Sequence, residues 1–191
     1  MITKIRLQNW KSFKDSTIYI DSLGILIGTN ASGKSNVLDA FAFLRAVGEG
    51  KSLLDAIQTV RGGEDWIIRR GEDSFCIEIE IEIEGSSYLL DLRVVKRNSV
   101  FSFGPCEIRR LGIEDDDAVP GEFIDSARNI TWKTYDVPIL LDFWAKIYAT
   151  FRNIIILDPV PAKMRDYCKI SKELKSDGSN VAGVLCALSP E

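Results

Sequence analysis

The residues with the clearest chemical potential form a glycine-rich segment with the pattern Gly28-x-x-x-x-Gly33-Lys34-Ser35. Glycines at these positions let the backbone curl so that several N–H groups converge on one phosphate. A lysine directly after them can reach the β- and γ-phosphates of a nucleotide, and the hydroxyl that follows can ligate Mg²⁺. The spacing therefore predicts a phosphate-binding loop, with Lys34 as the phosphate ligand and Ser35 as the magnesium ligand.

The elements that must position this loop can be read on either side of it. Residues 23–27 are a short apolar run, typical of a strand buried on both faces. After the loop, apolar residues recur with helical spacing, which predicts an amphipathic helix over 34–47, ended by Gly48 and Gly50. The positive end of that helix dipole would point into the phosphate site.

Other strands are predicted by period-two alternation of apolar and polar residues. This pattern occurs over 2–9 and 16–20, ahead of the loop, and most clearly over 75–84, where isoleucines alternate with glutamates. A turn at Gly85 leads into a strand over 88–97, and a further strand is expected near 100–110. Together these segments predict an antiparallel β-meander over about 72–134, and we expect basic residues of the 88–97 strand to pair with the glutamates, namely Arg93, Lys96 and Arg97.

The last third of the chain returns to helical spacing. A helix is predicted over 138–152, and the apolar run 153–157 is typical of another buried strand. A short helix near 160–168 and a last helix near 179–188 follow. The sequence contains no internal repeat and no linker that would separate two domains.

Composition excludes several kinds of chemistry. The chain has 191 residues and no histidine, so it lacks Ser-His-Asp and Cys-His nucleophile systems and histidine-liganded metal sites. With 24 Lys+Arg against 28 Asp+Glu, the net charge is −4, which excludes a generally basic nucleic-acid-binding protein. The 4 cysteines are scattered without a Cys-x-x-Cys pair, so a zinc knuckle is not expected.

The expected cellular compartment rests on two sequence features, a membrane span and a signal sequence, which are not found in these residues. No run of about 18 apolar residues occurs, so no membrane span is expected. The first residues lack the apolar core of a signal sequence. We therefore expect a cytoplasmic protein.

Two segments together resemble a known family. The N-terminal Asn9-Trp10-Lys11-Ser12-Phe13 and the loop Leu26-Ile-Gly-Thr-Asn-Ala-Ser-Gly-Lys-Ser-Asn36 are similar to the opening of RecF/SMC-like ATPases of the ABC superclass, in particular AAA-like ATPases related to the OLD family. The resemblance is specific over 1–45 and extends weakly over most of the chain. It implies an α/β P-loop NTPase fold like an ABC ATPase head, with a mixed sheet and an antiparallel β-meander lobe.

The resemblance also implies ligands and site residues. ATP and Mg²⁺ would bind the loop, and the segment around residues 9–13 lies near the nucleotide phosphates in that family. Lys11 is thereby a candidate phosphate neighbour, and a solvent-exposed turn lysine is the alternative. The full set of candidate nucleotide-binding residues is Lys11, Ser12, Gly28, Asn30, Ala31, Ser32, Gly33, Lys34, Ser35 and Asn36.

Two catalytic parts of the family do not occur in these residues. One is a signature loop of the Leu-Ser-x-Gly-Gly type, and the other is a Walker B strand that ends in Asp-Glu. The nearest strand ends in Asp158-Pro159, where proline stands in place of the glutamate, so Asp158 is interpreted as a strand-end or turn residue. The segment Asp177-Gly178-Ser179 predicts a turn and helix cap. We therefore expect a single incomplete head, with a P-loop core over 1–70, a β-lobe over 71–134 and a returning segment over 135–191.

On this interpretation the chain binds Mg-ATP and is inactive as an ATPase by itself. Hydrolysis would require a complementary C-terminal half or a homodimer partner that carries the missing parts. The alternative function is a non-catalytic interaction module with a regulatory nucleotide site, and the intact Gly33-Lys34-Ser35 favours the first function. DNA enters as a partner through the resemblance alone, without support from the acidic composition.

Overall fold

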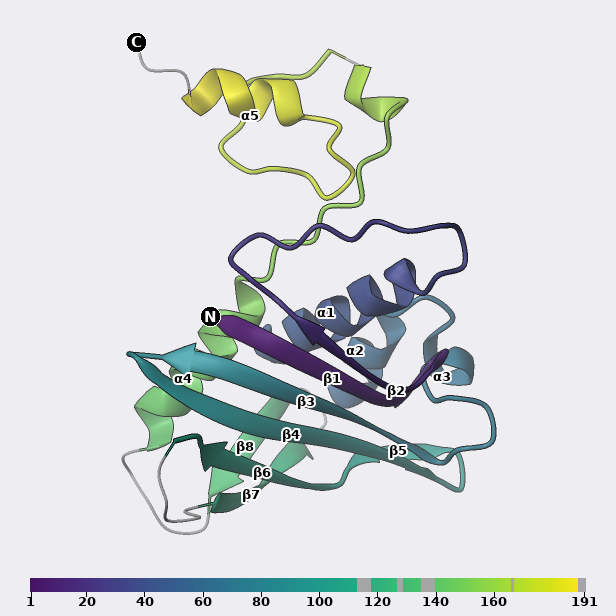
Figure 1. The fold of residues 1–191 in the computed structure, drawn as a ribbon, viewed down its shortest axis with the longest axis vertical. Helices are drawn as coiled ribbons and strands as arrows, with labels where there is room; N and C mark the ends of the chain where they lie inside the picture. The colour runs from purple at the N-terminus through teal and green to yellow at the C-terminus, as the bar shows by residue number, and fades with distance from the viewer. Residues whose placement is uncertain (113–117, 127–128, 135–139, 166, 189–191) are drawn as a thin grey trace. The chain divides into compact units, whose positions relative to one another are not determined.

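The computed structural model describes residues 1–112, 118–126, 129–134, 140–165 and 167–188. The chain divides into two compact units, Met1–Ile154 and Ile155–Glu191. Helices and strands both contribute to the first unit, as predicted for the α/β class (Figure 1). No helix in the described part of the chain is long and apolar enough to span a bilayer.

An antiparallel sheet is the frame of the first unit. Its strands are β1 (Ile2–Trp10), β2 (Phe13–Tyr19), β3 (Ser74–Ile83), β4 (Ser86–Arg97), β5 (Val100–Phe103), β6 (Pro105–Arg110), β7 (Ala118–Ser126) and β8 (Asn129–Thr134). The strand order is β2-β1-β3-β4-β6-β7-β8, and β5 pairs with β4 beside this path. The predicted strands near the N-terminus and the antiparallel meander are thus confirmed.

The register of the sheet follows from the alternation in its strands. Leu7 of β1 lies opposite Ile77 of β3, and Ile5 lies opposite Ile79, which puts these side chains on one buried face. The β3–β4 hairpin turns through Glu84 and Gly85, which both have positive φ, as a two-residue hairpin turn requires. The alternating sequence therefore dictates which face of the sheet packs against the helices.

Helices cover the apolar face of this sheet (Figure 1). They are α1 (Lys34–Gly48), α2 (Leu53–Gln58), α3 (Gly63–Trp66) and α4 (Leu140–Arg152). The predicted helix over 34–47 is confirmed as α1. Its Phe43 ring packs with Trp10 of β1 and Phe75 of β3, with ring centroids 5.0–5.8 Å apart among the three side chains. The middle of α1 is thereby packed against the central strands.

The second unit contains a 3₁₀ turn, η1 (Lys163–Arg165), and a helix, α5 (Val181–Leu188). The predicted helix near 160–168 is therefore reduced to one turn. The predicted turn at Asp177 is confirmed, because its carboxylate accepts a hydrogen bond from the N–H of Ser179 at 3.1 Å. The buried Asn180 side chain accepts from the N–H of Lys175 and donates to the carbonyl of Glu173, both at 2.8 Å.

Three predictions about strands are wrong. Residues 23–27 and 153–157 form no strand, and large apolar side chains of both segments are exposed. The predicted mixed sheet also differs from the structure, because every pairing between its described strands is antiparallel. A buried strand needs neighbours to satisfy its N–H and C=O groups, and no described strand lies beside either segment.

Candidate functional site

Close packing and backbone conformation favour glycine in the predicted phosphate-binding loop, most clearly at Gly33. Gly33 lies directly before α1 with φ of 95°, in the left-handed region. A Cβ atom on Gly33 would lie 2.8 Å from Cζ of Phe13, and one on Gly28 would lie 2.9 Å from Oγ of Ser32. A larger residue at Gly33 would be strained and would displace Phe13, whereas one at Gly28 would displace the Ser32 hydroxyl.

The ammonium of Lys34 is enclosed by this loop. Its Nζ donates to the carbonyl oxygens of Gly28 and Thr29, at 2.6 Å each, and lies 3.4 Å from Oγ of Ser32. The positive charge is thereby held within the curl of the backbone. A phosphate oxygen that reached this position would replace neutral carbonyl acceptors by a charged one, which makes a stronger hydrogen bond.

The other loop residues are open to solvent at the start of α1. Asn30, Ala31, Ser32 and Ser35 are exposed. The N–H groups of the first helical turn have no partner within the helix, and together with the helix dipole they favour an anion. The loop thus combines a lysine, the N–H groups at the start of the helix and the Ser35 hydroxyl at one end of α1.

The turn between β1 and β2 lies against the beginning of α1. The indole N–H of Trp10 donates to the carbonyl of Asn36 at 2.8 Å, and Nδ2 of Asn36 donates to Oγ of Ser12 at 2.7 Å. Phe13 packs against Gly33, as described above. Two candidate site residues that are distant in sequence, Ser12 and Asn36, are therefore in direct contact. Their contact with a nucleotide stays a prediction.

Lys11 is held in an ion pair, which corrects the exposed-turn alternative and leaves its role as a phosphate neighbour a prediction. Its Nζ lies 2.5 Å from Oδ2 of Asp39 and donates to the carbonyl of Arg61 at 2.8 Å. The side chain is only 9% exposed, so Lys11 is not a solvent-exposed turn lysine. Asp39 was not singled out by the sequence, although an aspartate among the apolar positions of an amphipathic helix is a signal that could have found it.

Asp158 and the predicted turn near it lie in the second unit. Asp158 is exposed, and its backbone N–H donates to the carbonyl of Ser176 at 2.8 Å. This contact joins Asp158 to a residue distant in sequence, so its interpretation as a strand-end or turn residue stays a prediction.

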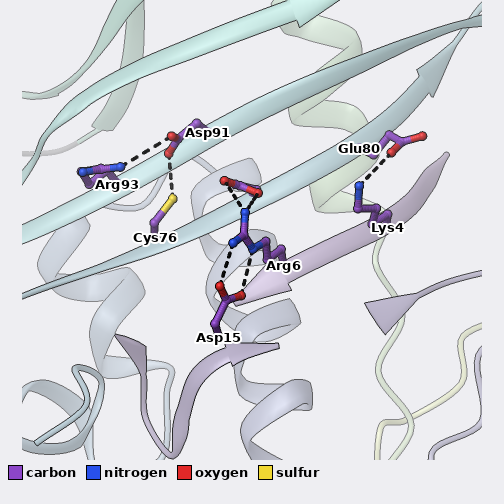
Figure 2. Close-up of polar contacts among 8 residues, drawn as sticks. Lys4, Arg6, Asp15, Cys76, Glu80, Asp91 and Arg93 are labelled. Carbon is purple, nitrogen blue, oxygen red and sulfur yellow. Dashed lines mark hydrogen bonds and ion pairs between the residues drawn. The ribbon is translucent and has the colours of Figure 1, made fainter. Parts of the chain in front are cut away.

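The sheet face that turns away from the helices carries ion pairs (Figure 2). Arg6 binds Asp15 through two hydrogen bonds of 2.7 and 2.8 Å and lies 3.2 Å from Glu78. Lys4 lies 3.6 Å from Glu80. Hydrogen bonds to Asp15, then to Glu78, raise the pKa of Arg6, and the hydrogen bond from Arg6 lowers the pKa of Asp15.

The partners of these glutamates correct a prediction. The glutamates pair with Lys4 and Arg6 of β1 instead of the basic residues of β4, because Glu78 lies opposite Arg6 on one side and opposite Asp91 on the other. Arg93 instead lies 3.8 Å from Asp91 of its own strand (Figure 2). This face is therefore held together by β1, which lies between β2 and β3 in the sheet.

Cys76 is a buried thiol on the same face. Its Sγ donates to Oδ1 of Asp91 at 2.7 Å (Figure 2). Burial, and then the Asp91 carboxylate, raise the pKa of the Cys76 thiol. The thiol is therefore neutral at physiological pH, which does not suit a nucleophile.

Comparison with known proteins agrees with the loop geometry. The family model described as AAA ATPase domain matches residues 1–178. The chain belongs to the AAA ATPase domain family. Membership in this ATPase family, together with the relatives below, confirms the predicted resemblance to RecF/SMC-like ATPases.

Several curated relatives of this AAA ATPase domain are much longer than the chain. The DNA double-strand break repair Rad50 ATPase of Sulfolobus acidocaldarius is 27% identical over 179 residues, which cover 91% of the chain and 17% of that relative. The protein of the same name from Thermoplasma volcanium is 34% identical over 113 residues, which cover 59% of the chain and 11% of the relative. The chromosome partition protein Smc of Methanococcus voltae is 42% identical over 53 residues, covering 27% of the chain and 4% of the relative. The chain thus spans less than a fifth of the length of these proteins.

Proposed function

We propose that the chain binds Mg-ATP at the N-terminal end of α1. The observation that carries this proposal is the ammonium of Lys34, held by carbonyl oxygens of a loop in which Gly33 has a positive φ and packs against Phe13. In this proposal Lys34 binds the β- and γ-phosphates, and the backbone of Asn30, Ala31, Ser32 and Gly33 surrounds them. Lys11, Ser12 and Asn36 are the neighbouring residues on the side of the β1–β2 turn.

Magnesium would be held together with the nucleotide. Mg²⁺ keeps several waters and takes one or two protein oxygens along with phosphate oxygens. The exposed hydroxyl of Ser35 in the first turn of α1 fits such a ligand. Within the described ranges, no group of three or more Cys, Asp and Glu side chains could hold a metal ion without a nucleotide. The bound ion would neutralise charge on the β- and γ-phosphates.

We further propose that hydrolysis requires a complementary half that carries the signature loop and the Walker B glutamate. The residues 1–191 contain neither motif, and Pro159, which follows Asp158, cannot act as a base. The exposed apolar segment 23–27 supports this proposal, because it has the composition of a buried strand and lacks a neighbouring strand. A strand from the complementary half, or from a homodimer partner, would cover it.

DNA is proposed as a partner on the printed names of the relatives, which concern DNA double-strand break repair and chromosome partition. A net charge of −4 means that any such binding must use a local surface. The affinity for duplex DNA would then fall with rising salt, with a slope that counts the phosphate contacts.

Titration calorimetry with Mg-ATP tests the nucleotide proposal. We expect saturable binding by the chain, and a Kd raised by roughly 10- to 100-fold in the Lys34→Ala variant, since hydrogen bonds to charged groups contribute about 1.5–3 kcal/mol. Lys14→Ala is the matched control, because Lys14 is an exposed lysine of β2. Equal affinity in the Lys34→Ala variant would overturn the proposed site. Rapid ATP turnover by the chain alone would contradict the need for a complementary half.

A further inference from the structure

Asp39 is a buried carboxylate in the middle of an apolar helix face. Its side chain is 6% exposed, and it stands on α1 among Val37, Ala40 and Phe43, which are also buried. A buried charge without a partner costs several kcal/mol. Asp39 avoids this cost through two cations: Nζ of Lys11 at 2.5 Å from Oδ2, and Nε of Arg61 at 3.7 Å from Oδ1.

The ion pair joins three separate segments at one point. Lys11 belongs to the β1–β2 turn, Asp39 to α1, and Arg61 to the segment between α2 and α3. The backbone of the turn is fixed as well, since the N–H of Lys11 donates to the carbonyl of Ile67 at 2.9 Å and the N–H of Arg69 donates to the carbonyl of Asn9 at 2.8 Å. The Lys11 ammonium is therefore held by its ion pair with Asp39, and the backbone that carries it is held by these two hydrogen bonds.

The hydrogen bonds of Lys11 leave one donor for another acceptor. An ammonium carries three N–H donors. Within the described part of the chain, one goes to Asp39 and one to the carbonyl of Arg61. The third belongs to a side chain that is only 9% exposed, so a nearby anion would interact with it more strongly than in water.

Lys11 belongs to the β1–β2 turn, which lies against the start of α1, where the nucleotide site is proposed. Asp39 follows Ser35 by four residues, so the two share one face of the helix, one turn apart. The residue next to Lys11, Ser12, is hydrogen-bonded to Asn36. The carboxylate of Asp39 thus anchors the lysine one turn behind the proposed magnesium ligand.

We propose that Asp39 is a positioning residue of the nucleotide site: it holds the Lys11 ammonium so that its remaining N–H donates to the terminal phosphate of bound ATP. This inference rests on the proposed function. A terminal phosphate contact distinguishes ATP from ADP, so Asp39 acts on nucleotide selectivity without touching the nucleotide.

The direction in which the affinity for Mg-ATP changes, when Asp39 loses its charge, distinguishes a positioning role from a purely electrostatic one. Removing the negative charge of Asp39 makes the region more positive, and by charge alone this would tighten binding of a polyanion such as ATP. Loss of positioning has the opposite effect, because the freed ammonium no longer meets the phosphate in one geometry. A merely structural role would lower thermal stability and change the affinities for ATP and ADP alike.

The test compares Kd values for Mg-ATP and Mg-ADP in Asp39→Asn, Lys11→Met and the double variant. We expect each single variant to raise the Kd for Mg-ATP about tenfold with a change below about threefold for Mg-ADP, since one hydrogen bond to a charged group is lost. The double variant should be no worse than either single variant, because both remove the same contact. Asp73→Asn is the charge-matched control, because Asp73 is exposed and lies before β3.

Each remaining outcome has a defined meaning. If Asp39→Asn fails to fold, Lys11→Met/Asp39→Leu removes both charges and leaves no lone buried ion, and it should show the same loss of ATP-over-ADP selectivity. Unchanged selectivity, or tighter binding of Mg-ATP, would overturn the role of Asp39. Should Lys34→Ala bind Mg-ATP like the unaltered chain, the proposed function itself fails. Loss of binding in Lys34→Ala with unchanged selectivity in Asp39→Asn refutes the positioning role alone.

Discussion

Two lysines beside the start of α1 hold their charges in different ways. Lys34 is bound by carbonyl oxygens of its own loop, which are neutral acceptors that a phosphate can replace. Lys11 is bound by the Asp39 carboxylate in a buried ion pair, which is costly to break. We therefore expect Lys34 to exchange partners when a nucleotide binds, and Lys11 to keep Asp39 as its partner.

The Asp177 turn in the second unit gives a pH-dependent prediction. The N–H and then the hydroxyl of Ser179, followed by the Lys163 ammonium, lower the pKa of Asp177 from 3.8 to about 2. Because the folded-state pKa is lowered, the stabilisation is fully present above the ordinary pKa and is lost as the pH falls through about 2. An NMR titration of the Asp177 carboxyl carbon should therefore show a midpoint near 2.

A midpoint near the ordinary value of 3.8 would show that the turn does not form in solution. The Asp177→Asn variant provides the control. It keeps an acceptor for the N–H of Ser179 and removes this contribution to the acid dependence of the second unit.

At the scale of elements, the contact between α1 and α4 decides how the helices cover the sheet. The two helices approach closely at Gly48, where an added Cβ would lie 2.6 Å from the backbone nitrogen of Arg152 and 2.6 Å from Cβ of Phe151. Phe151 and Leu44 are both fully buried in the core at this end of the helices. Gly48 is therefore a packing position as well as the end of a helix.

Replacing Gly48 by alanine should destabilise the first unit. Helix propensity alone would favour alanine by about 1 kcal/mol. The Cβ must instead push α4 away, and overpacking of this kind costs about 1–3 kcal/mol, so urea denaturation should show a net loss. Ala42→Gly in the same helix calibrates the propensity, with an expected loss of about 1 kcal/mol. A stabilised Gly48→Ala variant would contradict the close approach of the helices.

At the scale of the whole molecule, the exposed apolar segment 23–27 is the surface on which the proposed complementary strand would pack. Ile27 is 90% exposed, and Leu23 and Ile25 in the same segment are each 74% exposed. Apolar surface of this kind marks an interaction site when it is contiguous. The relatives, of which the chain covers 17% or less, have ample additional length to supply a strand.

Substitution of Ile27 by serine tests this interpretation. Because the side chain is exposed, the free energy of unfolding should change by less than about 0.5 kcal/mol. Self-association of the chain, followed by sedimentation velocity, should decrease, since the unpaired segment is its most exposed apolar surface near the loop. Val100→Ser on β5 is the control, because Val100 is 65% exposed and lies outside the segment. Equal self-association of the unaltered chain, Ile27→Ser and Val100→Ser would contradict the interpretation of residues 23–27 as an interaction surface.

The sequence predicted the elements whose signal is local, and it failed where a distant partner decides. The strands β1, β3 and β4 and the helix α1 follow from alternation and helical spacing, and the loop follows from residue types that its chemistry requires. The segment 23–27 has the composition of a buried strand, but a strand forms only when neighbours satisfy its backbone. Asp39 escaped notice because its partners, Lys11 and Arg61, come together only in the fold.

The central claim is that nucleotide phosphates bind the loop at the start of α1. The most direct measurement is the change of backbone amide NMR signals on addition of Mg-ATP. Saturable shifts should be largest at Gly33, Lys34 and Ser35, where the N–H groups would meet the phosphates, and they should disappear in Lys34→Ala. Unchanged amide signals at these three residues in the presence of saturating Mg-ATP would contradict the account.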